Sequence, residues 1–241
     1  VGSEMCIRDR LHAIFVSILL LPMANLLHQL MVALVRFNVR GWTRIYSLVF
    51  GQRSLRAKTR HGLALWLNPF EYIDSCVIRS GYYEAEVLES MLAALQDGQV
   101  LWDVGANIGL HSLTCKLLRP DVTVIAFEPN PAMAERIDIG RRANNLDISV
   151  VRQALGRQNE SAKLWLHSGN SGMSSLTNWH GVPIDQSISC TVCTGKSVID
   201  AGVPIPNVVK IDVEGNELAV LEGLGELILS PSLHTIIFED S

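Results

Sequence analysis

Small and acidic residues in the middle of the chain have the types and spacing of a nucleotide-type ligand site. An apolar run that starts at Val100 leads into Asp103, and Gly105-Ala106-Asn107-Ile108-Gly109 follows directly. Glycines let the backbone turn tightly and let a ligand approach the main chain. The backbone amides at the start of a following helix would face a polar or anionic part of that ligand. Asp103 could accept hydrogen bonds from a ligand ammonium or hydroxyl group.

A second acidic residue helps to separate two classes of ligand. The apolar run from Val122 to Phe127 ends in Glu128-Pro129-Asn130-Pro131, so Glu128 lies 19 positions after Gly109. A carboxylate at about this spacing binds the ribose diol in dinucleotide sites. A dinucleotide fingerprint would also need Gly at 105, 107 and 110, and this chain has Asn107 and Leu110. The pattern favours S-adenosylmethionine, which has a ribose but no phosphate, over the nicotinamide cofactor of an oxidoreductase.

The elements needed to position these residues alternate between strand and helix. Apolar runs predict strands at 100–103, 122–128, 148–153, 208–212 and 235–239, and helical periodicity predicts helices at 110–118, 130–145 and 214–228. A β-hairpin of strands 55–58 and 63–67 and a helix at 84–95 precede them. This order is typical of an α/β, Rossmann-like fold with a doubly wound, mostly parallel sheet, which binds ligands at the carboxyl ends of its strands.

Several of these segments together resemble the FkbM family of methyltransferases, which belong to the Rossmann-like S-adenosylmethionine enzymes. The resemblance covers roughly residues 81–239. The matching motifs, in family order, are Gly81-Tyr82-Tyr83-Glu84, Asp103-Val104-Gly105-Ala106-Asn107-Ile108-Gly109, Phe127-Glu128-Pro129-Asn130-Pro131, Ala154-Leu155-Gly156, Gly172-Met173-Ser174-Ser175-Leu176 and Lys210-Ile211-Asp212-Val213-Glu214-Gly215-Asn216-Glu217. The resemblance implies O-methylation of a hydroxyl on a sugar, glycolipid or polyketide-type acceptor, with S-adenosyl-L-methionine as the cofactor. It also implies a helix and a hairpin after the last strand, so we expect C-terminal strands to be missing here.

The resemblance and the predicted strand ends assign roles to the site residues. Those expected to hold S-adenosylmethionine are Asp103, Gly105, Ala106, Asn107 and Gly109 at the methionine part, Glu128, Pro129 and Asn130 at the ribose, and Gln153 and Ala154 at the adenine. Asp212 ends the fourth predicted strand and Glu214 follows it, and both are expected to orient or deprotonate the acceptor hydroxyl. For Glu214 the alternative is charge complementarity at a helix N-terminus. His111 is a further candidate base, with capping or packing of a first helical turn as its alternative.

The stretch from Gly156 to Asp200 departs from simple alternation. Short strands at 162–166 and 188–192 flank a polar loop and Ser174-Ser175-Leu176. The family resemblance implies that this insertion lies near the active site, so Ser174 and Ser175 are candidates for a role on the substrate side. The alternative is that the two serines only form a turn or cap a helix. Cys190 and Cys193 have the spacing of a zinc knuckle, but no second Cys or His pair follows, and we expect no metal.

Charge is distributed unevenly along the 241 residues. Residues 1–60 carry nine Lys or Arg against Glu4 and Asp9, a net charge of +7, so the net charge of −4 for the whole chain leaves −11 on the remainder. An acidic catalytic part argues against a nucleic-acid substrate, which would need a basic face.

The cysteines are five in number and are scattered along the chain. An odd number at irregular spacing does not resemble a disulfide framework, so the cysteines favour a reducing cytosol.

The N-terminal part predicts contact with a membrane. Residues 11–35 contain no Asp, Glu, Lys or Arg. This uncharged segment is long enough to cross a bilayer as a helix. Residues 36–60 contain seven basic residues and no acidic one, as on the cytoplasmic side of a membrane segment. We therefore expect a cytoplasmic protein held at the membrane face. The alternative for the N-terminal segment is a soluble helical extension. An alternative for the function of the chain is a non-catalytic, membrane-tethered module that binds the cofactor.

The predicted organisation has four parts. Residues 1–10 have no periodicity, look like translated sequencing adapter and are taken as a non-native leader. Residues 11–50 form the apolar helix and basic segment, and residues 51–98 form the hairpin and helical entry region. Residues 99–241 form the S-adenosylmethionine-binding methyltransferase domain.

Overall fold

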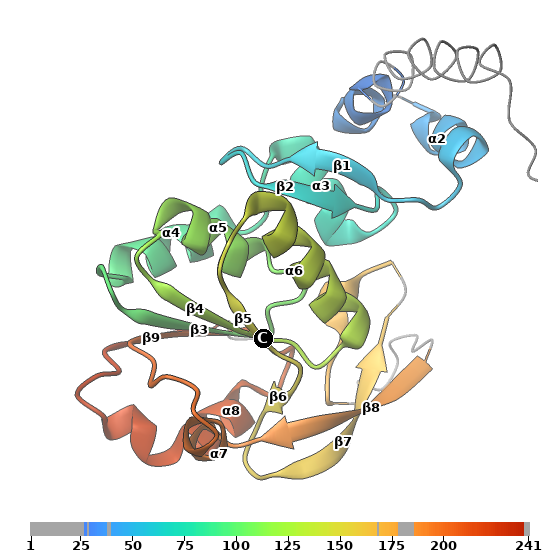
Figure 1. Ribbon diagram of the computed structural model, residues 1–241. Helices are drawn as coiled ribbons and strands as arrows, with labels where there is room; N and C mark the ends of the chain where they lie inside the picture. Colours follow the sequence, from blue (N-terminus) through green and yellow to red (C-terminus); the bar gives the residue numbers. More distant parts are fainter. Residues whose placement is uncertain (1–26, 28, 38–39, 168, 178–185, 239–241) are drawn as a thin grey trace, which may run out of the picture.

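The computed structural model describes residues 27, 29–37, 40–167, 169–177 and 186–238, which adopt the Rossmann-like architecture predicted from the sequence (Figure 1). Within these ranges the central sheet is parallel, in the order β10-β9-β3-β4-β5. Its strands are β3 (Val100–Val104), β4 (Thr123–Phe127), β5 (Ser149–Val151), β9 (Val208–Ile211) and β10 (Thr235–Phe238). The order reverses between β3 and β9, and α/β sheets bind their ligands at such a reversal.

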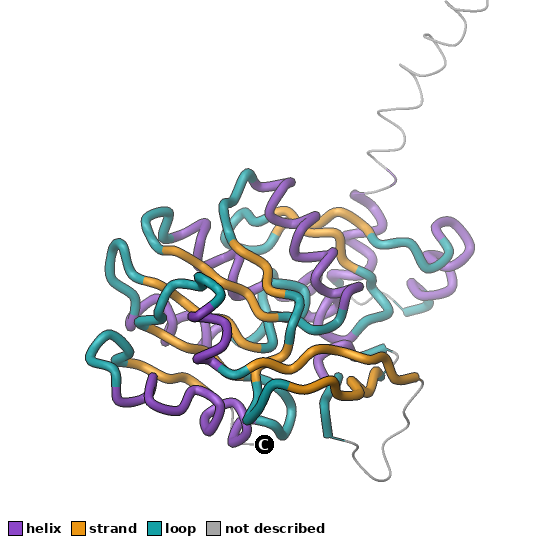
Figure 2. The backbone as a smooth tube through the Cα atoms, turned by 60° about the horizontal axis from the view of Figure 1, so that its bottom comes forward, coloured by secondary structure: helices purple, strands orange, loops and turns teal. Residues whose placement is uncertain are grey.

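Helices cover both faces of this sheet (Figures 1 and 2). One face carries α4 (Ala85–Ala94), α5 (Leu110–Leu118) and α6 (Pro131–Asn144), and the other carries α7 (Gly195–Asp200) and α8 (Glu217–Leu224). Successive side chains of a strand point to opposite faces. In β3, Leu101 therefore joins the apolar cluster that contains Leu113 of α5, whereas Trp102 joins the one that contains Leu224 of α8. Burial on both faces explains why these strands are continuous apolar runs in the sequence.

The entry region contains the predicted hairpin and one helix that was not predicted. Strands β1 (Leu55–Lys58) and β2 (Ala64–Leu67) pair antiparallel, and the predicted helix at 84–95 is α4. The additional helix is α3 (Tyr72–Ser80). Its sequence has several β-branched and polar residues of modest helix propensity, so packing of its buried face stabilises it instead.

Two predicted element boundaries are wrong. The third strand was expected to run to Gln153, but β5 ends at Val151 and the chain crosses to a second sheet of order β6-β8-β7. This sheet consists of β6 (Ala154–Leu155), β7 (Glu160–Leu166) and β8 (Gln186–Cys193), which confirms and lengthens the two predicted short strands. The helix predicted from 214 begins only at Glu217, because Glu214 and Gly215 both have left-handed backbone, and it gives way to a 3-10 turn, η2 (Gly225–Leu229).

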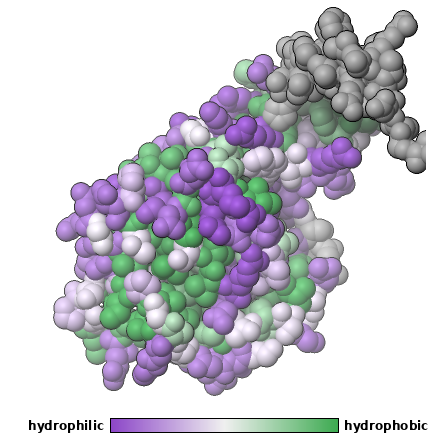
Figure 3. Space-filling model, viewed as in Figure 1, coloured by the Kyte–Doolittle hydropathy of each residue, from purple (hydrophilic) through white to green (hydrophobic). Residues whose placement is uncertain are grey.

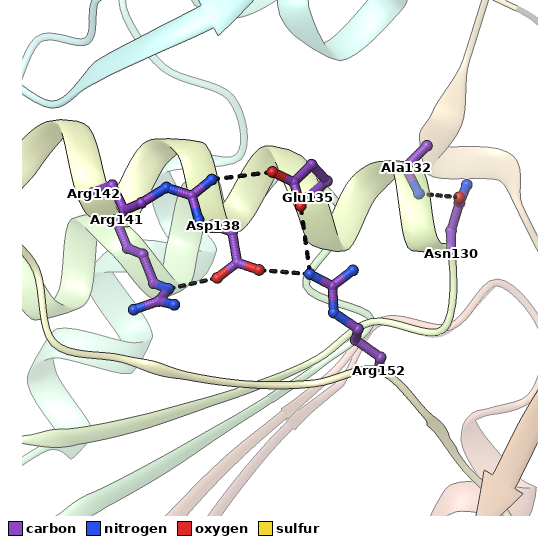
Figure 4. A network of polar contacts seen from close by, with 7 residues as sticks. All are labelled: Asn130, Ala132, Glu135, Asp138, Arg141, Arg142 and Arg152. Carbon is purple, nitrogen blue, oxygen red and sulfur yellow. Dashed lines mark hydrogen bonds and ion pairs between the residues drawn. The ribbon is translucent and has the colours of Figure 1, made fainter.

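A group of ion pairs holds α6 over the end of β5 (Figure 4). The pairs are Asp138–Arg141, Asp138–Arg152, Glu135–Arg142 and Glu135–Arg152. Arg152 directly follows β5, so its side chain joins the strand end to the helix. Asn130 Oδ1 accepts a hydrogen bond from the Ala132 amide at 3.0 Å, and Asn130 therefore caps the N-terminus of α6. In the space-filling view, hydrophilic side chains gather in a band over this helix (Figure 3).

The apolar segment predicted as a membrane helix, residues 11–35, lies for the most part outside the described residues. Near its described end, Met31 and Val35 are buried in the same apolar cluster as Tyr46 of α2 (Trp42–Phe50). No helix within the described ranges is long and apolar enough to cross a membrane. The membrane helix therefore stays a prediction.

A buried ion pair joins the entry region to α6. Asp74 Oδ2 accepts hydrogen bonds from Arg136 Nη2 and from the Asn68 amide, each at 2.6 Å, and the Asp74 side chain is fully buried. Arg136 Nη2 also donates to the Trp66 carbonyl of β2 at 3.1 Å. One guanidinium therefore links the hairpin, α3 and α6.

We expect Asp74→Ala to lower the free energy of unfolding by about 3–5 kcal/mol, because it leaves the Arg136 guanidinium and the Asn68 amide without their shared partner. Urea unfolding measures this loss. The matched control is Asp97→Ala, which removes a 3.0 Å ion pair to Arg119 from a carboxylate that is 79% exposed. That change should cost at most about 1 kcal/mol. Equal losses in the two variants would contradict the structural role of the buried pair.

Candidate active site

A pocket lies at the carboxyl ends of β3, β4 and β9, at the point where the strand order reverses. Its wall also includes the segment before α4 and the insertion between β7 and β8. The lining residues include Tyr83, Glu84, Gly105, Asn107, Glu128, Pro129, Asn130, Ala154, Leu155, Asn170, Ser171, Gly172, Ser174, Ser175, Leu176, Asp212, Val213, Glu214 and Asn216. The strand ends named by the sequence therefore meet at one cavity.

The turn after β3 directs its backbone amides toward the protein. The amides of Gly105 and Ala106 both donate to the Phe127 carbonyl at 3.0 Å, and the Asn107 amide donates to Glu128 Oε2 at 2.7 Å. These three donors already have partners, so the turn offers less to an anion than its sequence suggests. The hydrogen bonds instead tie the turn to the end of β4.

Gly105 is required for two reasons. Its φ is +77°, in the left-handed region that residues with a Cβ rarely adopt. A Cβ at this position would lie 1.8 Å from the Asp212 carbonyl oxygen. The turn after β3 and the end of β9 are therefore in direct contact, and only glycine lets them approach this closely.

Glu128 lies buried at the wall of the pocket. Its Oε2 accepts from the Asn107 amide at 2.7 Å and its Oε1 accepts from the Asn130 amide at 2.8 Å. Burial raises the pKa of Glu128 to about 7, although both amide hydrogen bonds oppose the shift. Each carboxylate oxygen can accept more than one hydrogen bond, so a ligand diol could still bind.

Behind the turn, Lys210 joins the ends of β3 and β9. Its Nζ lies 3.2 Å from Asp103 Oδ1 and 3.0 Å from Asp212 Oδ2, and it donates to the Gly105 carbonyl at 3.2 Å. Burial lowers the pKa of Lys210, but the two carboxylates outweigh this and hold that pKa above its usual range. Burial raises the pKa of Asp103, but Lys210 in particular brings that pKa below its usual value. The buried pair is therefore ionised at neutral pH.

The predicted site residues divide into those at the pocket wall and those behind it. At the wall lie Gly105, Asn107, Glu128, Pro129, Asn130, Ala154, Asp212 and Glu214, whereas Asp103, Ala106, Gly109, His111 and Gln153 are not among the lining residues. His111 is buried, with Nε2 3.4 Å from the Glu84 carbonyl oxygen, and its burial lowers its pKa. Because a base has to reach the reacting hydroxyl, these positions favour Asp212 and Glu214 over His111.

The sequence did not assign a role to three residues at or behind the pocket, although all three lie in motifs of the resemblance. Tyr83 and Glu84 line the pocket, and Lys210 connects Asp103 with Asp212. A further signal comes from the backbone. In the described part of the chain, the non-glycine residues with positive φ are Glu84, Asn107, Glu214 and Asn145, and the first three line this pocket. Such strained residues cluster at functional sites.

The charge of the pocket limits the ligands that it can hold. Glu84, Glu128, Asp212 and Glu214 contribute carboxylates, and none of the lining residues that the structure describes is Lys, Arg or His. A pyrophosphate would meet negative charge on several sides, whereas a sulfonium or ammonium group would be attracted. These carboxylates therefore suit the cationic, phosphate-free S-adenosylmethionine better than a nicotinamide dinucleotide.

The two cysteines with zinc-knuckle spacing lie on β8 and are not among the residues that line the pocket. Cys190 is buried together with Val192, as expected for alternating inward positions of a strand, and Cys193 is half-buried. Within the described ranges, no group of three or more His, Cys, Asp or Glu residues could hold a metal ion.

Fold and pocket together define a Rossmann-like domain suited to a cationic, ribose-containing ligand. The profile of the methyltransferase FkbM domain matches residues 103–241. The chain therefore belongs to the FkbM methyltransferase domain family, which confirms the resemblance seen in its motifs.

Three curated relatives are similar to this chain. Hexuronic acid methyltransferase AglP of Haloferax volcanii is 32% identical over 61% of this chain and 59% of its own length. Methyltransferase 1 of Beauveria bassiana is 29% identical over 56% of this chain and 62% of its own length. The 31-O-demethyl-FK506 methyltransferase FkbM of Streptomyces tacrolimicus is 26% identical over 70% of this chain and 71% of its own length. The chain thus spans about three fifths of the first two relatives.

Proposed function

We propose that this protein binds S-adenosylmethionine and transfers its methyl group to a hydroxyl on a sugar, glycolipid or polyketide-type acceptor. The observation that carries the proposal is the acidic pocket at the strand ends, with carboxylates from the ends of β4 and β9 and no basic lining residue among those described. Membership of the FkbM family agrees with it. The names of the relatives from Haloferax volcanii and Streptomyces tacrolimicus support the acceptor classes.

Each part of the cofactor has a candidate binding group. Glu128 would accept hydrogen bonds from the ribose hydroxyls. The apolar residues Ala154 and Leu155 at the start of the second sheet would lie against the adenine. The turn at Gly105 and Asn107 would receive the methionine part, with Asp103 holding the shape of that turn from behind through Lys210.

The acceptor side would be served by the residues after β9. When bound, S-adenosylmethionine supplies an activated methyl group. The acceptor oxygen forms the new bond to carbon as the carbon–sulfur bond breaks, and the hydroxyl proton passes to a base. We assign the base to Asp212 and the orienting hydrogen bond to Glu214. Lys210, whose Nζ lies 3.0 Å from Asp212 Oδ2, would keep the Asp212 side chain oriented.

Label transfer tests the proposed function. The chain is incubated with methyl-labelled S-adenosylmethionine and with methyl β-D-glucoside, methyl β-D-glucuronide and a hydroxylated macrolide, each in turn. We expect acid-stable label in at least one acceptor. Calorimetry with S-adenosylhomocysteine and with NAD distinguishes the alternatives: binding of NAD alone would overturn the proposal, and binding of S-adenosylhomocysteine without any transfer would favour a non-catalytic module.

The raised pKa of Glu128 predicts a pH-dependent cofactor affinity. The ionised carboxylate accepts from the ribose diol, so affinity for S-adenosylhomocysteine should fall about tenfold per pH unit below pH 7. Between pH 4.5 and 7 the folded protein holds a proton that the unfolded chain has lost, so this group's contribution to stability decreases as the pH rises through that window.

Glu128→Gln is the matched variant. It keeps the shape of the side chain but sets an amide NH2 against one of the two backbone donors, and it should lower the affinity by about 1–3 kcal/mol at pH 8. Its affinity should then be flat between pH 8 and 6. Calorimetric titrations at three pH values measure both effects. A wild-type affinity that does not change with pH would contradict the assigned ribose contact.

We further propose that the N-terminal region holds the protein at the cytoplasmic face of a membrane. α2 exposes 87% of Leu48, with basic side chains before and after it in the sequence and no acidic residue in 36–60. A protein that starts at Leu11 should sediment with vesicles containing anionic lipid, whereas one that starts at Gln52 should not. Equal recovery of the two in the soluble fraction would contradict this expectation.

A further inference from the structure

The segment 169–177, which we call the strap, contacts three separate walls of the pocket. The Gly169 carbonyl accepts from the Tyr72 amide of α3 at 2.9 Å. Ser171 Oγ donates to Asn107 Oδ1 at 3.1 Å, on the turn after β3. Ser175 Oγ donates to the Glu214 carbonyl at 2.6 Å, on the turn after β9. Through Ser171 and Ser175 the strap contacts Asn107 and Glu214, which are two of the three non-glycine residues with left-handed backbone that line the pocket.

The hydroxyl group of Ser175 has no capacity left for a substrate. Besides its bond to Glu214, it accepts from the Thr177 amide at 3.0 Å and from Asn216 Nδ2 at 3.3 Å. A serine hydroxyl offers one donor and two acceptor positions, so all three are used. The Ser175 backbone is fixed as well, because it exchanges two hydrogen bonds with Trp165 of β7, and the residue is only 1% exposed. Ser175 therefore acts through other residues.

The residue on which Ser175 acts is under backbone strain. Glu214 has a φ of +51° and Gly215 a φ of +86°. A non-glycine residue pays about 1–2 kcal/mol for the left-handed region, and it persists there only when its surroundings hold it. The amides of Val213 and Gly215 donate to Glu217 Oε1 at 3.3 and 3.0 Å, which holds the turn from the helix side. Ser175 holds it from the strap side.

We propose that Ser175 is a positioning residue for methyl transfer: through its hydrogen bond to the Glu214 carbonyl it keeps the Glu214 side chain at the acceptor side of the pocket. The inference rests on the proposed function and adds a role for the insertion. The insertion then serves as a support that orders the turn after β9 against the cofactor turn, and Ser175 is a buried support that makes no contact with substrate.

Ser175→Ala tests this role. The turnover number for the panel sugar that the wild-type protein methylates should fall by about 10–100-fold, since a misplacement of about 1 Å can cost 10²-fold, while affinity for S-adenosylhomocysteine changes by less than about twofold. Ser175→Thr keeps the hydroxyl and should recover most of the turnover. Ser161→Ala is the matched control, because it removes an exposed serine pair on β7 and β8. It should leave both quantities unchanged.

A double-mutant cycle shows whether Ser175 acts through Glu214. In a Glu214→Ala background, Ser175→Ala should slow turnover no further, because the side chain that it positions is absent. A full additional loss in that background would overturn the inference. So would wild-type turnover in Ser175→Ala.

Hydrogen exchange gives a readout that needs neither cofactor nor acceptor. Ser175→Ala should speed exchange of a peptide covering 213–217 by at least tenfold and leave one covering 103–109 unchanged. If Ser175→Ala folds poorly, Asn216→Ala, which removes one partner of the same hydroxyl, should speed exchange of 213–217 to a smaller degree. Unchanged exchange there in both variants overturns the inference. A wild-type protein that binds no S-adenosylhomocysteine overturns the proposed function instead, so the two failures are distinguishable.

Discussion

Gly105→Ala is expected to lower the free energy of unfolding by about 2–5 kcal/mol and to reduce affinity for S-adenosylhomocysteine more than tenfold. About 1–2 kcal/mol arises from forcing a residue with a Cβ into left-handed backbone, and about 1–3 kcal/mol arises from overpacking. The overpacking follows from the 1.8 Å approach of the added Cβ to the Asp212 carbonyl oxygen. To relieve this clash, the turn after β3 and the end of β9 have to separate, and both line the pocket.

Gly98→Ala separates the two contributions. Gly98 has almost the same φ, +76°, but nothing lies within 4 Å of a Cβ added there. This control should lose only the backbone contribution, about 1–2 kcal/mol, and should keep its affinity for S-adenosylhomocysteine. Urea unfolding and calorimetry on the same preparations measure both quantities. If the two variants lose the same stability and neither loses affinity, the close contact between the strand ends is not important for the site.

Most of the central fold could be predicted from the sequence because its strands are buried on both faces. Such strands are unbroken apolar runs, and the residue that ends each run marks the ligand edge of the sheet. The motifs at Asp103 and Glu128 could be placed at that edge without the structure. The glycine spacing then favoured S-adenosylmethionine, and the absence of basic residues in the described pocket lining supports the same choice.

What the sequence did not predict depends on contacts between distant residues. α3 has modest helix propensity, and its packing against the domain stabilises it. In the sequence, Lys210 is a single polar residue in an otherwise apolar strand. Its position between Asp103 and Asp212 becomes clear only from the order of the strands in the sheet, which places β9 beside β3. Likewise, the early end of β5 depends on a second sheet whose partner strand, β8, lies more than 30 residues further along the chain.

Asp212→Asn is expected to slow methyl transfer by roughly 10²–10⁴-fold at nearly constant affinity for S-adenosylhomocysteine. Asn keeps the shape of the side chain and its hydrogen bond from Lys210, but it cannot take the proton of the acceptor hydroxyl. The carboxylate lines the pocket at the end of β9, whereas the proposed ribose contact comes from Glu128 after β4. Chemistry and cofactor binding should therefore respond separately.

Asp200→Asn is the charge-matched control, because it removes a carboxylate that pairs with Lys196 on the surface of α7. Single-turnover transfer and cofactor affinity are followed on the same preparation of each variant. If Asp212→Asn transfers methyl at the parent rate, the base is another residue, and Glu214 is the next candidate at the pocket wall. If it loses cofactor without a chemical defect, Asp212 belongs to the binding shell, and its pairing with Lys210 at 3.0 Å then serves to shape the cofactor turn.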